Sequence, residues 1–202
     1  AVEAMDIIRG KRADIKLFFM GVKRPNASVT TSYTASQTIA RAEQLGLVNR
    51  WVFFNDWAPY EERENFLLEA DLGLNIHRHN LETRFSFRTR MMDYIWAGLP
   101  IITTEGDPLS DLVRTNRLGL TVPCGQPELL AEAILQAADA PETRLAWKKN
   151  CLITAQEFTW SRVFEPIVDV CRSPRPARDK EHAALWLSFM GNTANAPTPA
   201  AL

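Results

Sequence analysis

The chain has 202 residues, of which 46% are hydrophobic and 23% are charged, values that are ordinary for a globular domain. A formal net charge of −1 argues against a role in coating nucleic acid, which needs a strongly basic face, so no nucleic-acid partner is expected. No apolar run approaches the roughly 20 residues that span a bilayer, and the start of the chain lacks the order of a signal peptide. We therefore expect a cytoplasmic protein. Association with a membrane surface stays open, although no basic amphipathic surface indicates it.

Short apolar runs alternate with helical patterns through most of the chain. An amphipathic helix is expected at the start, and later helices at 33–46, 59–70, 86–97, 107–113 and 127–140. Between them, strands are expected at 15–21, 51–54, 72–76, 100–104 and 118–123. This alternation is typical of βαβ units, whose parallel strands form a sheet covered on both faces. The sequence predicts the doubly wound α/β class, in which ligands bind at the carboxyl ends of the strands.

The last third of the chain has a different composition. Residues 141–171 read as helix only, and residues 172–181 form a polar, proline-containing linker. A short helix at 182–190 and a disordered or partner-docked tail at 191–202 are expected to follow. We therefore predict one lobe at 1–171 and an extension at 172–202. The three cysteines are widely spaced and odd in number, which favours buried free thiols in a reducing compartment.

Three arginines lie close together in "ETRFSFRTRMMDYIWAGLP", residues 82–100. Arg84, Arg88 and Arg90 fall where a helix, capped by Ser86, is expected to begin, although the positive end of a helix dipole disfavours cations. Guanidinium groups and exposed amides at such a position make a phosphate site. The alternative is a solvated basic face that pairs with nearby acids, namely Glu61, Glu62 or Asp107.

Asp93 lies in the apolar part of the same helix, "MMDYIWAG". A carboxylate there must reach a partner or water, because burying an unpaired charge is unfavourable. It could accept hydrogen bonds from a ribose diol. The alternative is a structural salt bridge to a neighbouring arginine.

Other polar residues follow the expected strands. Trp57, in "NDWAP", offers a flat face for a base or a packing surface for the core, with equal weight. Glu105 and Asp107 could meet a sugar hydroxyl, but capping of the next helix is the stronger interpretation. His77 and His79 lack a third ligand at a plausible spacing, so no metal site is expected. The sequence contains neither a glycine-rich dinucleotide fingerprint nor a P-loop.

The segments "VFFNDWAPYEERENFLLEADLGLNIHR", "RTRMMDYIWAGLPIITTEGDPLSDLV" and "GLTVPCGQPELLAEAI" resemble a known family. They resemble the second, donor-binding lobe of group 1, family 4-like glycosyltransferases with the two-lobed GT-B fold, over roughly residues 1–171. The most specific element is the acid-bearing helix followed by "AGLP", a strand and "TEGD". The resemblance implies a Rossmann-like lobe that binds a nucleotide-diphosphate sugar, often a UDP-sugar, without a metal or other cofactor. It favours hexosyl transfer with retention of anomeric configuration.

The resemblance also implies roles for individual residues. Asp93 would contact ribose where the family usually has Glu, and Asn55 and Trp57 would lie near the base. Glu82 would contact the sugar only if its loop is three residues longer than usual, because the position eight before Asp93 is Phe85. No catalytic residue is assigned. The diphosphate would be bound by residues of 84–90, namely Arg84, Arg88, Thr89 and Arg90.

Two parts of the family pattern are missing from this sequence. The first strand of the lobe, with its Gly-Arg turn and following Lys, does not precede residue 1, and neither does an acceptor-binding lobe. We therefore expect a truncated chain that lacks its N-terminal lobe and is inactive alone. The alternatives are a non-catalytic nucleotide-binding or partner-docking module, and a nucleotide-sugar epimerase of the same fold. The acceptor, base, sugar and oligomeric state are not specified by the sequence.

Overall fold

The computed structural model describes residues 1–22 and 32–174. The chain divides into two compact units, residues 1–157 and 158–202. The sequence-based division at residue 171 grouped the helices after residue 158 with the first lobe. The expected short helix at 182–190 and the expected tail lie outside the described residues.

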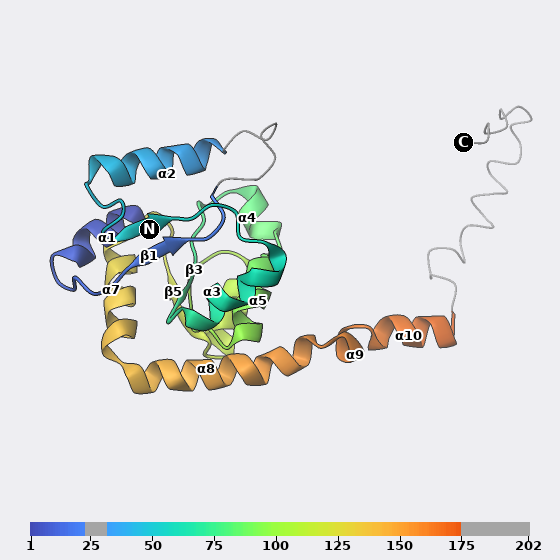
Figure 1. Cartoon of the computed structure of the whole chain (residues 1–202). Helices are drawn as coiled ribbons and strands as arrows, with labels where there is room; N and C mark the ends of the chain where they lie inside the picture. The colour runs from blue at the N-terminus through green and yellow to red at the C-terminus, as the bar shows by residue number, and fades with distance from the viewer. Residues whose placement is uncertain (23–31, 175–202) are drawn as a thin grey trace, which may run out of the picture. The chain divides into compact units, whose positions relative to one another are not determined.

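Among the described residues, five short strands form the centre of the first unit, each within a predicted strand. Their pairing is parallel throughout, but it separates them into a β1–β2 pair and a β3–β4–β5 sheet (Figure 1). In register, Leu17 lies opposite Val52, and Ile101 lies between Gly73 and Gly119. The strands are β1 (Leu17–Phe19), β2 (Val52–Phe54), β3 (Gly73–Asn75), β4 (Ile101–Thr104) and β5 (Gly119–Val122).

Helices connect these strands, which confirms the predicted α/β class. Ser32 caps α2, and Asp107 caps α6 in a capping box with Ser110, so local polar side chains start both helices. Gly98 ends α5 in a left-handed conformation that glycine adopts readily, with a φ of 67°. The helices are α1 (Val2–Arg9), α2 (Tyr33–Gln44), α3 (Arg63–Glu69, after a 3-10 turn at Tyr60–Glu62), α4 (Leu81–Phe85), α5 (Thr89–Ala97), α6 (Pro108–Thr115), α7 (Pro127–Asp139) and α8 (Pro141–Ala155).

The start of α5 differs from the prediction. Ser86 does not cap this helix, which begins at Thr89; Ser86 ends the short helix α4 instead. Asn80 caps α4 by accepting a hydrogen bond from the Thr83 amide at 2.7 Å. The Ser86 hydroxyl then donates to Glu82 at 2.5 Å, so it is engaged within α4.

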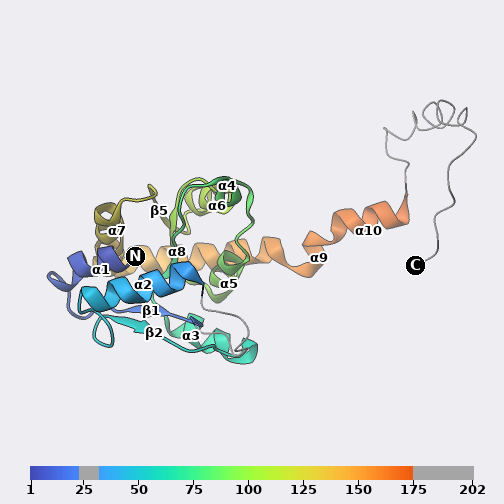
Figure 2. The same ribbon diagram turned by 90° about the horizontal axis from the view of Figure 1, so that it is seen from above.

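Two apolar cores lie on opposite faces of β4. Ile102 belongs to a core with residues of α1 and α7, whereas Ile101 packs with residues of α5 and α6. Successive strand residues point to opposite faces, so β4 contributes side chains to both cores. Helix α1 lies beside α7 in both views (Figures 1 and 2), and α5 packs against α8. The unit is therefore a sheet layer between two helical layers.

The described part of the second unit consists of two short helices, α9 (Trp160–Val163) and α10 (Glu165–Arg172). The rings of Trp160 and Phe164 contact each other, with centroids 5.0 Å apart. Among the described residues, no helix is both long and apolar enough to span a bilayer.

The three cysteines are free, as predicted, but only one of them is buried. Cys151 of α8 is fully buried, and burial raises the pKa of its thiol to about 12. Cys124 is half-buried in the loop after β5, and Cys171 is exposed on α10. The expectation of three buried thiols is therefore wrong, because two of the positions lie outside the cores.

Gly119 offers a test of the close approach between β4 and β5. A β-carbon at this position would overlap the carbonyl group of Ile101. We expect Gly119→Ala to lower the free energy of unfolding by about 1–3 kcal/mol, as overpacking of a filled interior does.

The matched control is Gly10→Ala, where the nearest atom to a β-carbon is 3.9 Å away. Its free energy of unfolding should stay unchanged or rise by up to about 1 kcal/mol. Urea denaturation measures both variants. Equal stabilities for the two variants would contradict the packing described for Gly119.

Candidate functional site

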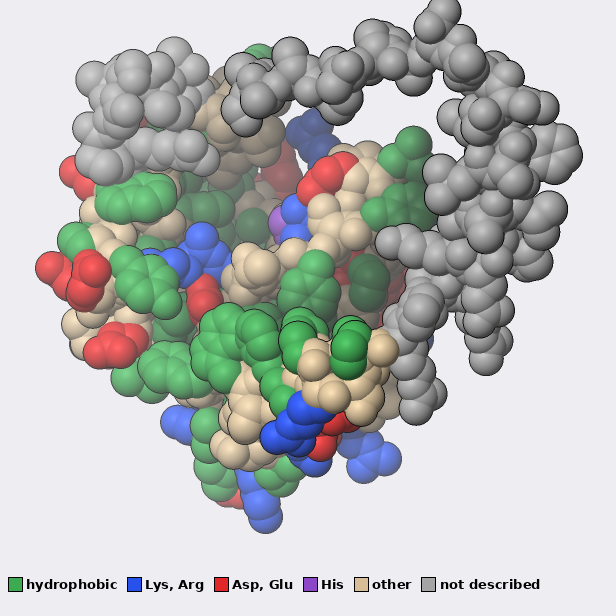
Figure 3. All heavy atoms as spheres, turned by 90° about the vertical axis from the view of Figure 1, so that its right-hand side faces the viewer, with side chains coloured by type: hydrophobic (Ala, Val, Ile, Leu, Met, Phe, Trp, Pro, Cys, Tyr) green, Lys and Arg blue, Asp and Glu red, His purple; other side chains and the backbone are tan. Residues whose placement is uncertain are grey.

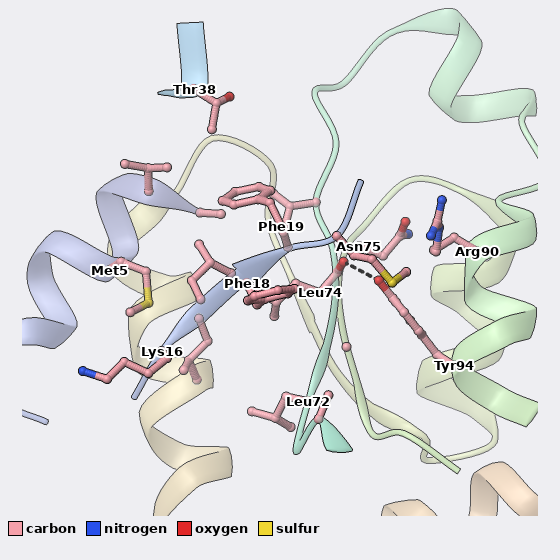
Figure 4. A pocket seen from close by; sticks show the side chains of 18 of the residues that line it. Met5, Lys16, Phe18, Phe19, Thr38, Leu72, Leu74, Asn75, Arg90 and Tyr94 are labelled. Atoms are coloured by element: carbon pink, nitrogen blue, oxygen red, sulfur yellow. Dashed lines mark hydrogen bonds between the residues drawn. The ribbon is translucent and has the colours of Figure 1, made fainter. Parts of the chain in front are cut away.

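A cleft of about 1580 Å³ opens between β1 and β3. Apolar side chains line it along the strands, including Phe18 and Phe19 of β1 and Leu72 and Leu74 at β3 (Figure 4). Its volume exceeds the roughly 300–1,000 Å³ of a typical small-molecule pocket. The cleft is therefore larger than one bound nucleotide requires.

Polar side chains gather where the cleft meets the carboxyl end of β3. A recess on this side of the molecule holds basic and histidine side chains (Figure 3). The lining at this end includes Asn75, His77, Arg78, Arg88, Thr89 and Arg90. Three of the four residues predicted to bind diphosphate are therefore together in the cleft. Arg84, the fourth, is not part of the lining.

The first turn of α5 contributes amides to the same place. Among the described residues, no group accepts a hydrogen bond from the amides of Thr89 or Arg90. Unpaired amides at a helix N-terminus, together with the helix dipole, favour an anion. The side chains and the backbone thus present positive charge to the same end of the cleft.

Arg88 is held in place by α4. Its Nη2 atom donates to Glu82 Oε2 at 2.7 Å and to the Thr83 hydroxyl at 3.2 Å. Its side chain is 19% exposed, and its buried Nε atom has no partner among the described residues. Hydrogen bonds from Ser86 and then from Arg88 lower the pKa of the Glu82 carboxyl. Glu82 therefore orients Arg88; its predicted contact with the sugar stays a prediction.

Arg90 and Arg84 differ in their surroundings. Arg90 points into the cleft near Asn75 and Tyr94 (Figure 4), and it forms no ion pair with any described residue. Arg84 lies on the surface of α4, with its guanidinium 5.6 Å from the centroid of the Phe85 ring. Arg90 is therefore available to an anion in the cleft.

Asp93 pairs with an arginine that sequence reasoning missed. Arg63 of α3 donates to Asp93 Oδ2 at 2.5 Å and lies over the Tyr60 ring, 5.3 Å from its centroid. Asp93 does not line the cleft. The structure thus contains the salt bridge that the sequence left open as an alternative. The ribose contact of Asp93 stays a prediction.

A buried polar network at the end of β3 was also missed. Asn75 is buried, and its side-chain amide donates to the Thr103 hydroxyl at 3.0 Å. That hydroxyl donates to the backbone carbonyl of Asn75, also at 3.0 Å. His77 continues the network, with Nε2 2.7 Å from Asn75 Oδ1. The available signal was an asparagine within the apolar run "LGLNI". A buried polar side chain needs such partners, and here they connect β3 to β4.

The loops after β3 and β5 are also connected. Cys124 donates from its thiol to the His77 carbonyl at 3.2 Å and accepts from the His79 amide at 3.2 Å. Burial, and then the nearby charge of Arg88, lowers the pKa of His77. Among residues 1–22 and 32–174, no three His, Cys, Asp or Glu side chains are grouped to hold a metal ion.

The two residues predicted near the base lie beyond the cleft lining. The backbone amide of Asn55 donates to the Phe19 carbonyl at 3.0 Å, which extends the β1–β2 pairing. Trp57 is half-exposed and covers Gly21, 3.7 Å from where a β-carbon would lie. Their role near a base stays a prediction.

The two acids after β4 are occupied locally. The Asp107 carboxylate accepts from the Ser110 amide at 2.7 Å, so the capping interpretation is confirmed. Glu105 is exposed, and it accepts a long hydrogen bond of 3.4 Å from the Thr121 hydroxyl.

Comparison with known proteins decides the family. The profile described as "Glycosyl transferases group 1" matches residues 1–140, more than half of the chain. The chain belongs to the group 1 glycosyl transferases. No curated protein sequence matches it significantly.

Solved structures of this group have the same fold at low sequence identity. WaaG, a glycosyltransferase involved in lipopolysaccharide biosynthesis, is 20% identical with a TM-score of 0.62, and the match covers 86% of this chain and 42% of WaaG. Sucrose-phosphate synthase from Thermosynechococcus elongatus is 17% identical with a TM-score of 0.65, over 85% of this chain and 41% of the synthase.

Anabaena HepE, solved in complex with UDP and glucose, is 16% identical with a TM-score of 0.67, over 85% of this chain and 44% of HepE. The chain thus spans less than half the length of each of these three proteins. The matches confirm the predicted Rossmann-like lobe of a GT-B fold.

The titration of His77 tests the electrostatics of the site. We expect its midpoint, followed by NMR, to lie below the ordinary value of 6.5, because burial disfavours the charged ring and Arg88 adds to this effect. Removing the Arg88 charge in Arg88→Ala should raise the midpoint, while burial keeps it below 6.5.

The lowered pKa also fixes the sign of the pH effect on stability. As the pH falls through 6.5, the unfolded chain takes up a proton that the folded chain does not, so the free energy of unfolding should fall. A His77 midpoint at or above 6.5, or one that does not respond to Arg88→Ala, would contradict this description of the site.

Proposed function

We propose that this chain is the donor-binding lobe of a glycosyltransferase and that it binds the diphosphate of a nucleotide sugar at the carboxyl end of the cleft. One observation carries the proposal: Arg88, Arg90 and the free amides of the first turn of α5 face the same end of the cleft. The family assignment supports the same function.

The charges in the cleft suit an anion with more than one negative group. Arg90 and Arg78 have no ion-pair partner among the described residues, and Glu82 neutralises Arg88 only in part, because Nε has no partner. A diphosphate could therefore accept hydrogen bonds from guanidinium groups and from amides of α5 together. The lowered pKa of His77 favours the neutral ring, whose Nε2 lies 2.7 Å from the acceptor Asn75 Oδ1, so His77 is held by Asn75 and is not counted among the donors to the diphosphate.

These groups would assist transfer by stabilising the leaving group. When the bond between the sugar and the diphosphate breaks, negative charge grows on the diphosphate and positive charge on the sugar. Preorganised donors lower the barrier by stabilising the charge that develops. Among the described lining residues at the carboxyl end of β3 there is no carboxylate, so we assign no nucleophile.

The finer parts of the proposal concern the donor and the whole enzyme. We infer a UDP-sugar donor, hexosyl transfer with retention, and no requirement for a metal. HepE, a structural match of the same fold, was solved with UDP, which supports this choice of donor. The acceptor would be bound by a further lobe, since this chain spans only 41–44% of the similar structures.

Calorimetry with UDP and GDP tests the binding site. We expect Arg88→Ala and Arg90→Ala each to weaken nucleotide binding by about tenfold or more, because each removes a hydrogen bond to a charged group. Arg84→Ala is the matched control, since Arg84 lies six residues from Arg90 but outside the cleft lining.

The control should bind like the unaltered chain. Because Arg88→Ala also frees Glu82, the Arg90→Ala result is the cleaner measure of direct contact. The proposal fails if millimolar UDP and GDP both leave the calorimeter signal unchanged, or if Arg84→Ala loses as much affinity as Arg90→Ala.

A further inference from the structure

The ring of His77 has one nitrogen atom that the proposed binding of a diphosphate does not use. Nε2 lies 2.7 Å from Asn75 Oδ1, whereas the other ring nitrogen, Nδ1, has no hydrogen-bond partner among the described residues. Nδ1 is not one of the buried side-chain atoms that lack a partner, so it is open to solvent. Because His77 lines the cleft at the carboxyl end of β3, Nδ1 can meet a ligand there.

A chain of hydrogen bonds decides whether Nδ1 donates or accepts. The Thr103 hydroxyl has one proton, and the backbone carbonyls of Asn75 and Thr104, 3.0 and 3.3 Å away, can only accept it. Toward the Asn75 side chain this hydroxyl is therefore the acceptor, so the amide nitrogen faces it, at 3.0 Å. The same nitrogen lies 3.0 Å from Met91 Sδ, which also only accepts. The amide oxygen of Asn75 is thus the atom that faces His77.

The His77 ring must donate from Nε2, because the Asn75 oxygen can only accept. A neutral imidazole has a single N–H group, so Nδ1 keeps its lone pair and is an acceptor. Burial, and then the charge of Arg88, lowers the pKa of His77, which favours this neutral ring. The oxygens of a diphosphate also carry lone pairs, so they cannot donate to Nδ1. A hydroxyl group can.

The backbone of His77 is held from two neighbouring elements. Its amide donates to the Thr104 hydroxyl of β4 at 3.0 Å, and its carbonyl accepts from the Cys124 thiol, after β5, at 3.2 Å. With the ring held by Asn75 as well, Nδ1 has a fixed position. A site that is built to pair with a ligand hydroxyl discriminates strongly against ligands that lack it.

The Thr83 hydroxyl connects this position with the proposed diphosphate site. It donates at 2.8 Å to the carbonyl of Arg78, the residue after His77, and it accepts from Arg88 Nη2 at 3.2 Å. Arg88 is therefore separated from the backbone beside His77 by one side chain. In a nucleotide sugar, the hydroxyl groups nearest the diphosphate belong to the transferred sugar and to the ribose, which are bonded to its two ends.

The transferred sugar suits this position better than the ribose does. The base is predicted near Asn55 and Trp57, which follow β2, whereas His77 contacts Cys124 in the loop after β5. A ribose bonded to that base would lie on the β2 side of the diphosphate. The sugar, at the other end of the diphosphate, would lie on the side of β4 and β5.

We infer that Nδ1 of His77 accepts a hydrogen bond from a hydroxyl group of the transferred sugar, so that His77 helps to select the donor. The inference rests on the proposed function, because the bound diphosphate sets the position of the sugar. Asn75 is a positioning residue: it fixes the acceptor form of the ring and acts on the sugar only through His77.

Two substitutions of His77 separate the roles of its two nitrogens. Glutamine places its amide nitrogen close to the position of Nε2, so it can still donate to Asn75, but it has no acceptor in place of Nδ1. Asparagine places its amide oxygen close to the position of Nδ1 and loses the contact with Asn75. Calorimetry with UDP, UDP-glucose and UDP-galactose at about pH 8, where the ring is neutral, compares the variants. The ratio of the dissociation constants of each UDP-sugar and of UDP isolates the contribution of the sugar.

We expect His77→Gln to weaken the binding of the UDP-sugar about three- to tenfold, the effect of one lost hydrogen bond, and to leave UDP binding unchanged. His77→Asn should keep a ratio closer to that of the unaltered chain. His79→Gln is the matched control, because His79 is exposed, lies two residues from His77 and is outside the cleft lining. Its ratio should not change.

The deficit of His77→Gln should shrink as the pH falls. Protonation places a hydrogen on Nδ1, so the unaltered chain loses its acceptor below the midpoint of His77. Burial and the charge of Arg88 lower the pKa of His77, whereas Asp107 and Glu82 raise it, so these groups together set that midpoint. A deficit for the UDP-sugar that stays constant from about pH 8 to about pH 5 would contradict the role of Nδ1.

Three further results would overturn the inference. NMR that finds the proton of the neutral ring on Nδ1 would exclude the acceptor, whether or not a nucleotide binds. Equal losses of UDP and UDP-sugar affinity in His77→Gln, or no loss of either, would leave His77 without a contact to the sugar. A smaller preference of this variant for UDP over 2′-deoxy-UDP would assign Nδ1 to the ribose. If UDP fails to bind the unaltered chain, the proposed diphosphate site fails as well, which distinguishes the two claims.

Discussion

The burial of β4 between two apolar cores is the constraint on which the candidate site depends. Ile101 and Ile102 point into different cores, so β4 cannot shift its register without exposing one of them. The hydrogen bonds between Asn75 and Thr103 then connect the end of β3 to β4. A further hydrogen bond joins the His77 ring to the Asn75 side chain. The loop that leads to α5 therefore begins from a fixed point.

The positions of the basic residues depend on this packing of β3 and β4. Helix α4 holds Arg88 through Glu82 and Thr83, and the first turn of α5 places Thr89 and Arg90 at the cleft. A guanidinium at a helix N-terminus is unfavourable without a counter-charge, and Glu82 supplies only part of one. The remaining positive charge is what the proposed diphosphate would neutralise. Family membership and the electrostatics of the site thus support the same function.

Local sequence patterns predicted much of this fold, but they did not predict contacts between residues far apart in the chain. Apolar runs and caps placed the five strands and most helices, because each signal lies within a few residues, as Asp107 and Ser110 illustrate. Helix α4 was missed because five residues show no helical period, and its cap, Asn80, was not recognised. The partner of Asp93 was missed because Arg63 is 30 residues away in the chain. The separation of β1 from β3 likewise depends on which strands pair with each other, and the sequence of one segment does not specify its partner strand.

A crystal structure of the chain soaked with UDP tests the central claim most directly. The account predicts the diphosphate at the carboxyl end of β3, with its oxygens within hydrogen-bond distance of Arg90, of Arg88 and of the amides in the first turn of α5. A diphosphate bound at Arg84 or elsewhere on the surface, with Arg88 and Arg90 untouched, would contradict it.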